Sequence, residues 1–353
     1  MPRIERLPAG ALDIVGDVHG EIDALRDLLR LLGYDAQGEH PEQRRLVFLG
    51  DLVDRGPDSV AVVTLVRRLV EAGFAQVVLG NHELNLLRGQ RKPGNDWLWD
   101  EGAHHDAPFV PYARASAAQR VEMLAWFETL PLALHREDLR IVHAAWSDDA
   151  LRQIDSAQGG VAEMFAAWDA QADAWLASQG WTQRAHQEHA AYVHHYGDSS
   201  YPMPMLPAYG YREEQRQMRN PLRVLTSGVE RCADAPFYTA HQWRFARRVP
   251  WWDEYKGDVP VVVGHFWRQY LPLDRRQLGK GDADLFEGID PQAWLGPRGR
   301  VFCVDYSVGG RYKERAAGSV TRTRLAALRW PERDLVLDDG ACVPTVAFGG
   351  GTP

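Results

Sequence analysis

The chain has 353 residues, and 40 lysines and arginines against 48 aspartates and glutamates give it a formal net charge of −8. This acidic balance excludes non-specific binding along a nucleic-acid backbone, although a local basic pocket for one phosphate group stays compatible with it. No run approaches the ~18 apolar residues of a membrane-spanning helix, and Met1–Gly10 has no apolar signal core. The cysteines at 232, 303 and 342 are too scattered for a disulfide framework and indicate free thiols in a reducing cytoplasm.

The first third of the chain alternates short apolar runs with helical patterns. Strands are predicted at 11–15, 46–49 and 77–79, and helices at 22–32 and from about 57 to 73. This alternation predicts βαβ units and a parallel sheet. Later strands are predicted at 139–142, 259–263, 301–305, 325–329 and 335–337.

The middle of the chain has a different composition. Residues from about 150 to 195, rich in Ala, Gln, His and Trp, predict helices, whereas residues 196–220, rich in Tyr, Pro and Met, predict an ordered loop. No flexible Ser/Gly-rich linker marks a boundary. We therefore interpret residues 1–353 as one domain with an insertion at about 150–258.

Five predicted strands end in side chains able to bind a metal ion. They are Asp17, Asp51, Asn81, His143 and His265. His19 lies two residues after Asp17, so on extended chain the two side chains point the same way. Each residue alone would be a turn former or an ordinary imidazole. Because ligands of open α/β sheets bind at the carboxyl ends of strands, the five together predict one metal site, with donors that suit Mn, Fe or Zn better than Ca.

The motifs around these residues resemble those of the calcineurin-like metallophosphoesterase superfamily. They are Gly16–Gly20 (GDVHG), Gly50–Gly56 (GDLVDRG), Gly80–Glu83 (GNHE), His143 and Gly264–His265. The Asp-Arg-Gly and Asn-His-Glu forms are similar to the phosphoprotein phosphatase branch, which includes serine/threonine phosphatases and bacterial diadenosine tetraphosphatases. The resemblance implies an α/β fold, a four-layer α/β/β/α sandwich with a helical insertion.

The resemblance also implies two divalent metal ions, expected to be Mn, with Fe or Zn as alternatives. The implied ligands are Asp17, His19 and Asp51 for one ion and Asp51, Asn81, His143 and His265 for the other. His82, oriented by Asp54, is implied as the general acid, and Arg55 as a phosphate ligand. The implied enzyme is a metal-dependent phosphoric ester hydrolase in which a hydroxide bridging the two ions attacks phosphorus. No covalent phosphoenzyme is needed, so Cys303 is expected to be structural.

The substrate stays open at this point. The first expectation is a phosphate monoester on a phosphoserine or phosphothreonine protein. The alternative is a nucleotide polyphosphate, either a dinucleoside tetraphosphate or an RNA cap. A phosphate-binding scaffold without turnover is disfavoured because every ligand and the acid are present. No membrane partner is expected, and the expected location is the cytoplasm.

Three features near the motifs are left without a fixed role. Trp267 stands where many superfamily members have a second histidine, and residues 304–310 are similar to the closing strand of the diadenosine tetraphosphatase-like group. The tryptophans at 243, 251 and 252 are expected in the core, with a nucleobase-stacking wall as the alternative. A second phosphate-binding arginine is implied but not placed among Arg88, Arg223, Arg231, Arg244, Arg247 and Arg248.

Overall fold

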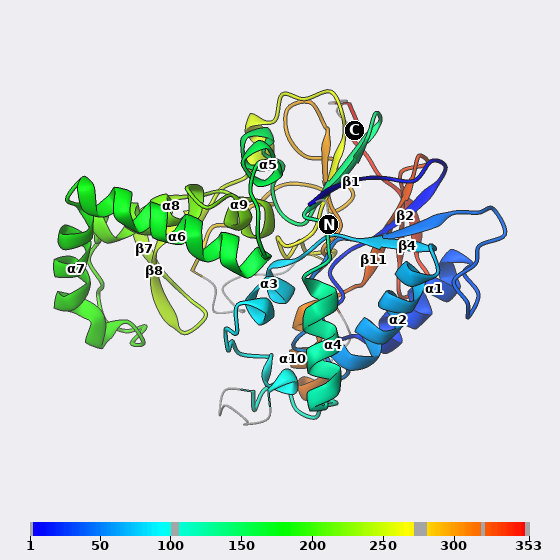
Figure 1. Cartoon of the computed structure of the whole chain (residues 1–353), viewed down its shortest axis with the longest axis horizontal. Helices are drawn as coiled ribbons and strands as arrows, with labels where there is room; N and C mark the ends of the chain where they lie inside the picture. The colour runs from blue at the N-terminus through cyan, green and yellow to red at the C-terminus, as the bar shows by residue number, and fades with distance from the viewer. Residues whose placement is uncertain (1–2, 100–105, 272–280, 319–321, 350–353) are drawn as a thin grey trace. The chain divides into compact units, whose positions relative to one another are not determined.

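The computed structural model describes residues 3–99, 106–271, 281–318 and 322–349 (Figure 1). Contacts divide the chain into two compact units. Unit 1 comprises Met1–Trp146, Trp252–Leu271 and Ile289–Pro353, and unit 2 comprises Ser147–Trp251 and Pro272–Gly288.

A six-stranded sheet in unit 1 has the order β13-β12-β11-β2-β3-β4. Its strands are β2 (Leu12–Val15), β3 (Arg45–Phe48), β4 (Ala75–Val77), β11 (Ala326–Trp330), β12 (Asp334–Leu337) and β13 (Cys342–Pro344). The pairs β2–β3 and β3–β4 are parallel, whereas β11 and β12 pair antiparallel with their neighbours. Helix α1 (Ile22–Leu32) follows β2 and α2 (Ser59–Glu71) follows β3, and Figure 1 shows them together beside this sheet. The predicted βαβ units are therefore confirmed.

Helix α1 shows why the sequence forms these elements. Its apolar side chains recur at helical spacing and are buried on one face. Gly33 ends the helix at φ 99, a left-handed conformation that glycine adopts without a Cβ penalty, and its N–H bonds the carbonyls of Leu29 and Arg30.

A five-stranded sheet in unit 1 has the order β1-β5-β6-β9-β10. Its strands are β1 (Ile4–Arg6), β5 (Ala133–Arg136), β6 (Leu139–Val142), β9 (Val261–Val263) and β10 (Val301–Cys303). Ile14 and Val47 of the first sheet share one buried cluster with Ile141, Val262 and Phe302 of the second. The sheets therefore pack face to face, and the predicted mixed α/β fold is confirmed.

Several short helices complete unit 1. They are α3 (Asn81–Leu87), η1 (Asp96–Leu98), α4 (Ala117–Phe127), η5 (Val308–Gly310) and α10 (Arg311–Ala317), with η3 (Trp251–Glu254) at the boundary of the units. Helix α3 begins directly after β4 and contacts α4.

Unit 2 consists of helices and one antiparallel strand pair. Its elements are α5 (Asp148–Asp155), α6 (Val161–Ser178), α7 (Trp181–Tyr192), η2 (Val193–His195), α8 (Pro207–Met218), α9 (Pro221–Ser227), β7 (Glu230–Thr239) and β8 (Gln242–Arg248). Helix α8 contacts α6, α7, α9 and both strands. The ordered loop predicted over 196–220 is wrong at α8. Pro207 occupies the first helical turn and residues 213–217 (EEQRQ) are strong helix formers, which the Tyr, Pro and Met content upstream concealed.

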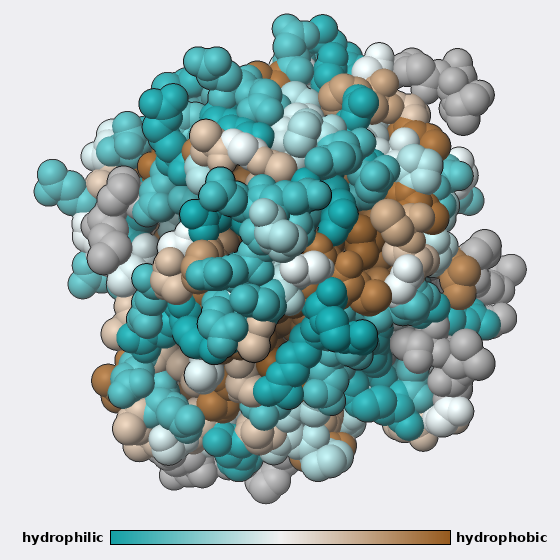
Figure 2. Space-filling model, turned by 90° about the vertical axis from the view of Figure 1, so that its right-hand side faces the viewer, coloured by the Kyte–Doolittle hydropathy of each residue, from teal (hydrophilic) through white to brown (hydrophobic). Residues whose placement is uncertain are grey.

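None of the helices that the structure describes is both long enough and apolar enough to cross a membrane. Figure 2 shows hydrophilic residues over most of one face, with smaller groups of hydrophobic residues between them. The large hydrophobic side chains that are exposed, such as Leu31, Val110 and Val193, are far apart in the sequence.

Candidate metal centre

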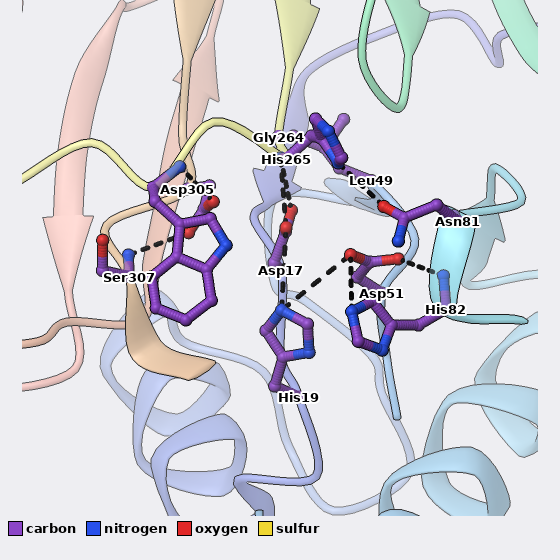
Figure 3. A network of polar contacts seen from close by, with 12 residues as sticks. Asp17, His19, Leu49, Asp51, Asn81, His82, Gly264, His265, Asp305 and Ser307 are labelled. Carbon is purple, nitrogen blue, oxygen red and sulfur yellow. Dashed lines mark hydrogen bonds and ion pairs between the residues drawn. The ribbon is translucent and has the colours of Figure 1, made fainter. Parts of the chain in front are cut away.

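The predicted ligands follow strand ends in unit 1. Asp17 and His19 follow β2, Asp51 follows β3, and Asn81 follows β4 at the start of α3. Three of the predicted ligands have left-handed backbone, with φ 48 at His19, 48 at Asp51 and 70 at His265. Such conformations are costly for residues with a Cβ and cluster at functional sites. The chain turns sharply here, and these turns direct the side chains toward one another (Figure 3).

One carboxylate oxygen lies at the centre of the group. Oδ2 of Asp51 is 3.9 Å from Nε2 of His19, 3.9 Å from Nε2 of His82 and 3.4 Å from Nε2 of His143. Burial alone would raise the pKa of Asp51, but the surrounding imidazoles, His143 foremost, hold this pKa well below its usual range. Asp51 is therefore a buried carboxylate that stays ionised.

The amide of Asn81 connects two further ligands. Its Oδ1 lies 3.1 Å from Nε2 of His143 and 2.8 Å from Nδ1 of His265. The Nδ1 of His143 lies 2.6 Å from the Leu49 carbonyl, which fixes the ring and leaves Nε2 toward Asn81 and Asp51.

Asp17 lies between the backbone of His265 and the ring of His19. The backbone N–H of His265 donates to its Oδ2 at 3.0 Å, and that oxygen is 4.0 Å from Nε2 of His19. Burial raises the pKa of Asp17 well above its usual range, and the nearby Asp305 carboxylate raises it further. A positive ion would relieve this repulsion.

The donor set fits divalent metal ions. Two groups of buried side chains, His19–Asp51–His82 and Asp51–His143–His265, each bring their ligand atoms within 4.8 Å of one another. Asp51 belongs to both groups, which is the arrangement that a carboxylate shared by two ions requires. Imidazole with carboxylate suits Mn, Fe or Zn. The first group contains His82 where the resemblance implies Asp17.

His82 faces two carboxylates through its two ring nitrogens. Nδ1 lies 2.5 Å from Oδ2 of Asp54, and Nε2 faces Asp51. His82 and Asp54 are both buried. A histidine whose Nδ1 is fixed by a carboxylate can carry a proton at Nε2.

Arg55 lies at the edge of the centre. Its Nη1 is 3.1 Å from Nε2 of His19, and its guanidinium lies over the indole of Trp267, 4.8 Å from the ring centroid. Trp267 donates its backbone N–H to Oδ2 of Asp305 at 2.7 Å. A Cβ on Gly309 would approach Cδ2 of His19 to 2.4 Å and Nη1 of Arg55 to 3.0 Å, so only glycine fits there. The tryptophan that replaces a second histidine thus supports the cationic side chain.

The prediction of the site missed three residues that hold its parts in place. Glu83 accepts the backbone N–H groups of Asp51 and Leu52 at 2.9 and 2.8 Å, and that of Gly80 at 3.1 Å. Burial, followed by the Asp51 charge, raises the pKa of Glu83 to about 7. Its position three residues after Gly80, the N-cap of α3, is a capping-box signal that could have identified it. The other two residues are Asp305 and Trp97.

Other candidates have structural partners elsewhere. Arg223 binds Asp169 at 2.7 Å within unit 2, and Arg247 lies 3.7 Å from Asp234. Trp252 is buried and packs edge to face on Phe266 at 5.2 Å, as the core expectation requires. Trp251 is also buried, whereas Trp243 is only half-buried and donates to a backbone carbonyl of unit 2.

Comparison with known proteins places these motifs in a wider group. The family model described as calcineurin-like phosphoesterase matches residues 11–287. The asymmetrical bis(5'-nucleosyl)-tetraphosphatase PrpE of Oceanobacillus iheyensis is 34% identical over 140 residues, which cover 38% of this chain and 54% of that protein. The symmetrical bis(5'-nucleosyl)-tetraphosphatase of a Janthinobacterium is 39% identical over 133 residues, 37% and 42% of the two chains.

The chain thus spans about half the length of the curated relatives it matches. Among solved structures, the cold-active protein-tyrosine phosphatase of a psychrophilic Shewanella has a TM-score of 0.47 at 16% identity, covering 98% of this chain and 83% of that one.

Proposed function

The chain belongs to the calcineurin-like phosphoesterase family, and from this premise we propose that it is a two-metal hydrolase of phosphate monoesters on serine and threonine side chains. The observation that carries the proposal is the position of Asp51, whose Oδ2 faces His19, His82 and His143, with the His82–Asp54 pair beside it.

In this proposal the metal ligands are those implied from the sequence. They are Asp17, His19 and Asp51 for one ion and Asp51, Asn81, His143 and His265 for the other. When bound, two divalent ions lower the pKa of a coordinated water and neutralise phosphate charge. We propose Mn as the native metal. The free cysteines support the cytoplasmic location that we also propose.

The remaining chemistry belongs to the protein's own side chains. Arg55 pairs with a phosphate oxygen and offsets its charge. Asp54 holds Nδ1 of His82, so Nε2 delivers the proton to the departing oxygen. An alkoxide leaving group requires that proton, whereas the phosphate leaving group of a polyphosphate needs it far less. The buried His82–Asp54 pair therefore favours a monoester.

A dinucleoside polyphosphate is the second candidate substrate. The curated relatives that match the chain are named as bis(5'-nucleosyl)-tetraphosphatases, and this similarity favours it. In this reading the same ions and Arg55 act on a phosphoanhydride.

The deciding experiment measures phosphate release by the Mn-loaded protein. A phosphoserine/phosphothreonine peptide and diadenosine tetraphosphate are compared as kcat/KM, with Asp51→Asn as the inactive control. Preference for the peptide supports the first substrate, and preference for the nucleotide supports the second. Turnover of neither by the metal-loaded protein contradicts the proposed function.

A further inference from the structure

We propose that Trp97 is a positioning residue, whose indole N–H fixes the Asp54 carboxylate that orients His82, and that the loop 92–98 around it also seats Arg55. This inference rests on the proposed function, in which His82 delivers a proton and Arg55 binds phosphate.

Both oxygens of Asp54 have a partner. Nε1 of Trp97 donates to Oδ1 at 2.7 Å, and Oδ2 lies 2.5 Å from Nδ1 of His82. Asp54 is fully buried and Trp97 is 2% exposed, so water does not compete for these contacts. Hydrogen bonds to an ionised group are the stronger kind. The indole therefore sets the rotation of the carboxylate, and through it the position of the imidazole.

An indole suits this position for a chemical reason. Its N–H is a donor only, so it cannot take the proton that the carboxylate shares with His82. A hydroxyl or imidazole in its place could both donate and accept. The large rigid ring also fills the space beside the buried carboxylate, since Trp97 is among the largest fully buried side chains.

The backbone at Asp54 and Arg55 requires support of its own. The two residues have φ 76 and φ 69, which are left-handed conformations that cost about 1–3 kcal/mol each at residues other than glycine. The N–H of Asp54 donates to Oγ of Ser59 at 2.9 Å, and the N–H of Arg55 donates to the carbonyl of Gly94 at 3.0 Å. The loop 92–98 thus holds Asp54 by a side chain and Arg55 by a carbonyl.

The loop is itself fixed by a second carboxylate. Asp106 accepts the backbone N–H of Gly94 through Oδ1 at 2.5 Å and that of Asp96 through Oδ2 at 2.8 Å. Gly94 has φ 96, and a Cβ there would come within 2.9 Å of Cγ of Arg55. Hydrogen bonds and close packing of the loop 92–98 therefore connect Asp106 to Asp54 and Arg55.

The test compares Trp97→Phe with a matched control, Trp99→Phe. Trp99 lies two residues away, and its indole donates to Oδ1 of Asn95 at 3.3 Å. The substrates are phenyl phosphate and p-nitrophenyl phosphate, which share a ring but differ in how much their leaving oxygen needs a proton. We expect Trp97→Phe to lower kcat on phenyl phosphate about tenfold, with KM little changed and p-nitrophenyl phosphate affected by less than about twofold. Trp99→Phe should leave both substrates at wild-type rates.

A merely structural role predicts a different result. If Trp97→Phe slows both esters equally, or neither, the positioning role is refuted. Metal content and melting temperature are measured on each variant to show that the site is still assembled. If the wild type hydrolyses neither ester nor the two substrates above, the proposed function fails instead.

An NMR measurement decides the contact separately and needs no activity. The Trp97 indole resonance, assigned by its loss in Trp97→Phe, should exchange slowly with D2O in the wild type and shift in Asp54→Ala. A resonance that does not move in Asp54→Ala would overturn the inference. If Trp97→Phe does not fold, the signal lost in Trp99→Phe identifies the Trp99 indole. A slowly exchanging indole resonance among the remaining tryptophans that shifts in Asp54→Ala then supports the contact, and no shift among them overturns it.

Discussion

At the scale of single residues, His82 has a different carboxylate near each of its two ring nitrogens. Nδ1 lies against Asp54 and Nε2 faces Asp51, so the ring touches both the acid pair and the metal ligands. Its neighbours allow two roles, and one substitution separates them.

We predict that His82→Asn lowers kcat on a phosphoserine peptide by about 10²–10⁴-fold, because general acid catalysis contributes that much. Metal analysis should still find two bound ions per chain in His82→Asn. Arg55→Lys is the control, because it also leaves the metal ligands intact and should keep both ions. Loss of an ion together with activity would assign His82 to the metal instead.

The strand-end residues could be predicted because each follows an apolar run in the sequence, and all except His143 also follow a glycine. Trp97 could not, because its partner Asp54 lies 43 residues away and no local pattern connects them. Glu83 had a capping signal, but its bonds to Asp51 and Leu52 depend on how two strands lie side by side. The ligand roles and the acid role stay predictions.

At the scale of elements, the end of β9 shows how closely the backbone approaches the site. A Cβ on Gly264 would lie 2.0 Å from Oδ1 of Asp17. The strand can therefore end in glycine only, because any side chain would displace the carboxylate.

We predict that Gly264→Ala weakens metal binding about 10–100-fold, the usual effect of disturbing groups that orient a ligand. Titration with Mn monitored by calorimetry measures it. Gly197→Ala is the control, since nothing lies within 4 Å of a Cβ there. Equal affinity in both variants would show that Asp17 tolerates the displacement.

Three helices of unit 2 meet at one carboxylate. Asp169 of α6 accepts from Nη2 of Arg223 in α9 at 2.7 Å and from Nδ2 of Asn220 at 2.8 Å. Arg216 of α8 lies 3.6 Å away. Burial alone would raise the pKa of Asp169, but these hydrogen bonds, with Arg223 first, hold it below its usual value.

A lowered folded-state pKa means that the stabilisation is complete above the unfolded pKa of ~3.9 and is lost as pH falls through the folded value. We predict that Asp169→Asn lowers the free energy of unfolding by about 2 kcal/mol at pH 7 and by much less near pH 3. Urea unfolding at both pH values measures it. Asp173→Asn on the same helix is the control, because its side chain is 50% exposed and pairs only with Arg216 in the described contacts. The same loss at both pH values would contradict the role of the charge.

Helices with clear periodicity, such as α1 and α2, could be predicted, and so could their order. Strand β1 (Ile4–Arg6) contains two charged residues, and β5 (Ala133–Arg136) ends in His135 and Arg136, so neither shows the apolar run that identified β2 and β3. The pair β7–β8 joins polar, half-buried strands, so its sequence lacks the apolar alternation that identifies a strand.

At the scale of the whole molecule, unit 1 has several buried carboxyl side chains close together. Asp17, Asp51, Glu83 and Asp305 are all buried at the carboxyl ends of its strands. Burying like charges together is unfavourable without positive charge to offset it. Divalent ions bound there should therefore stabilise the folded chain.

We predict that chelation lowers the melting temperature and that Mn restores it, with a stabilisation of about 2.7 kcal/mol at one hundred times the dissociation constant. Differential scanning calorimetry measures this. Asp51→Asn should abolish the response. A melting temperature independent of metal in the wild type would contradict a metal centre in these residues.

The interpretation as one domain with an insertion at about 150–258 stays a prediction. The two compact units divide the chain at Ser147–Trp251, with Pro272–Gly288 also in unit 2. We did not predict the second segment, because no local sequence pattern connects residues 272–288 with residues 147–251.

Strand β2 pairs on one side with β11, so Leu12 lies beside Trp330. During synthesis, the segment that carries Asp17 and Asp51 leaves the ribosome long before its neighbour strand exists. Unit 2 is nearly complete by Trp251, ahead of His265. The nascent chain therefore holds an incomplete set of the predicted metal ligands until the segment around His265 has been made.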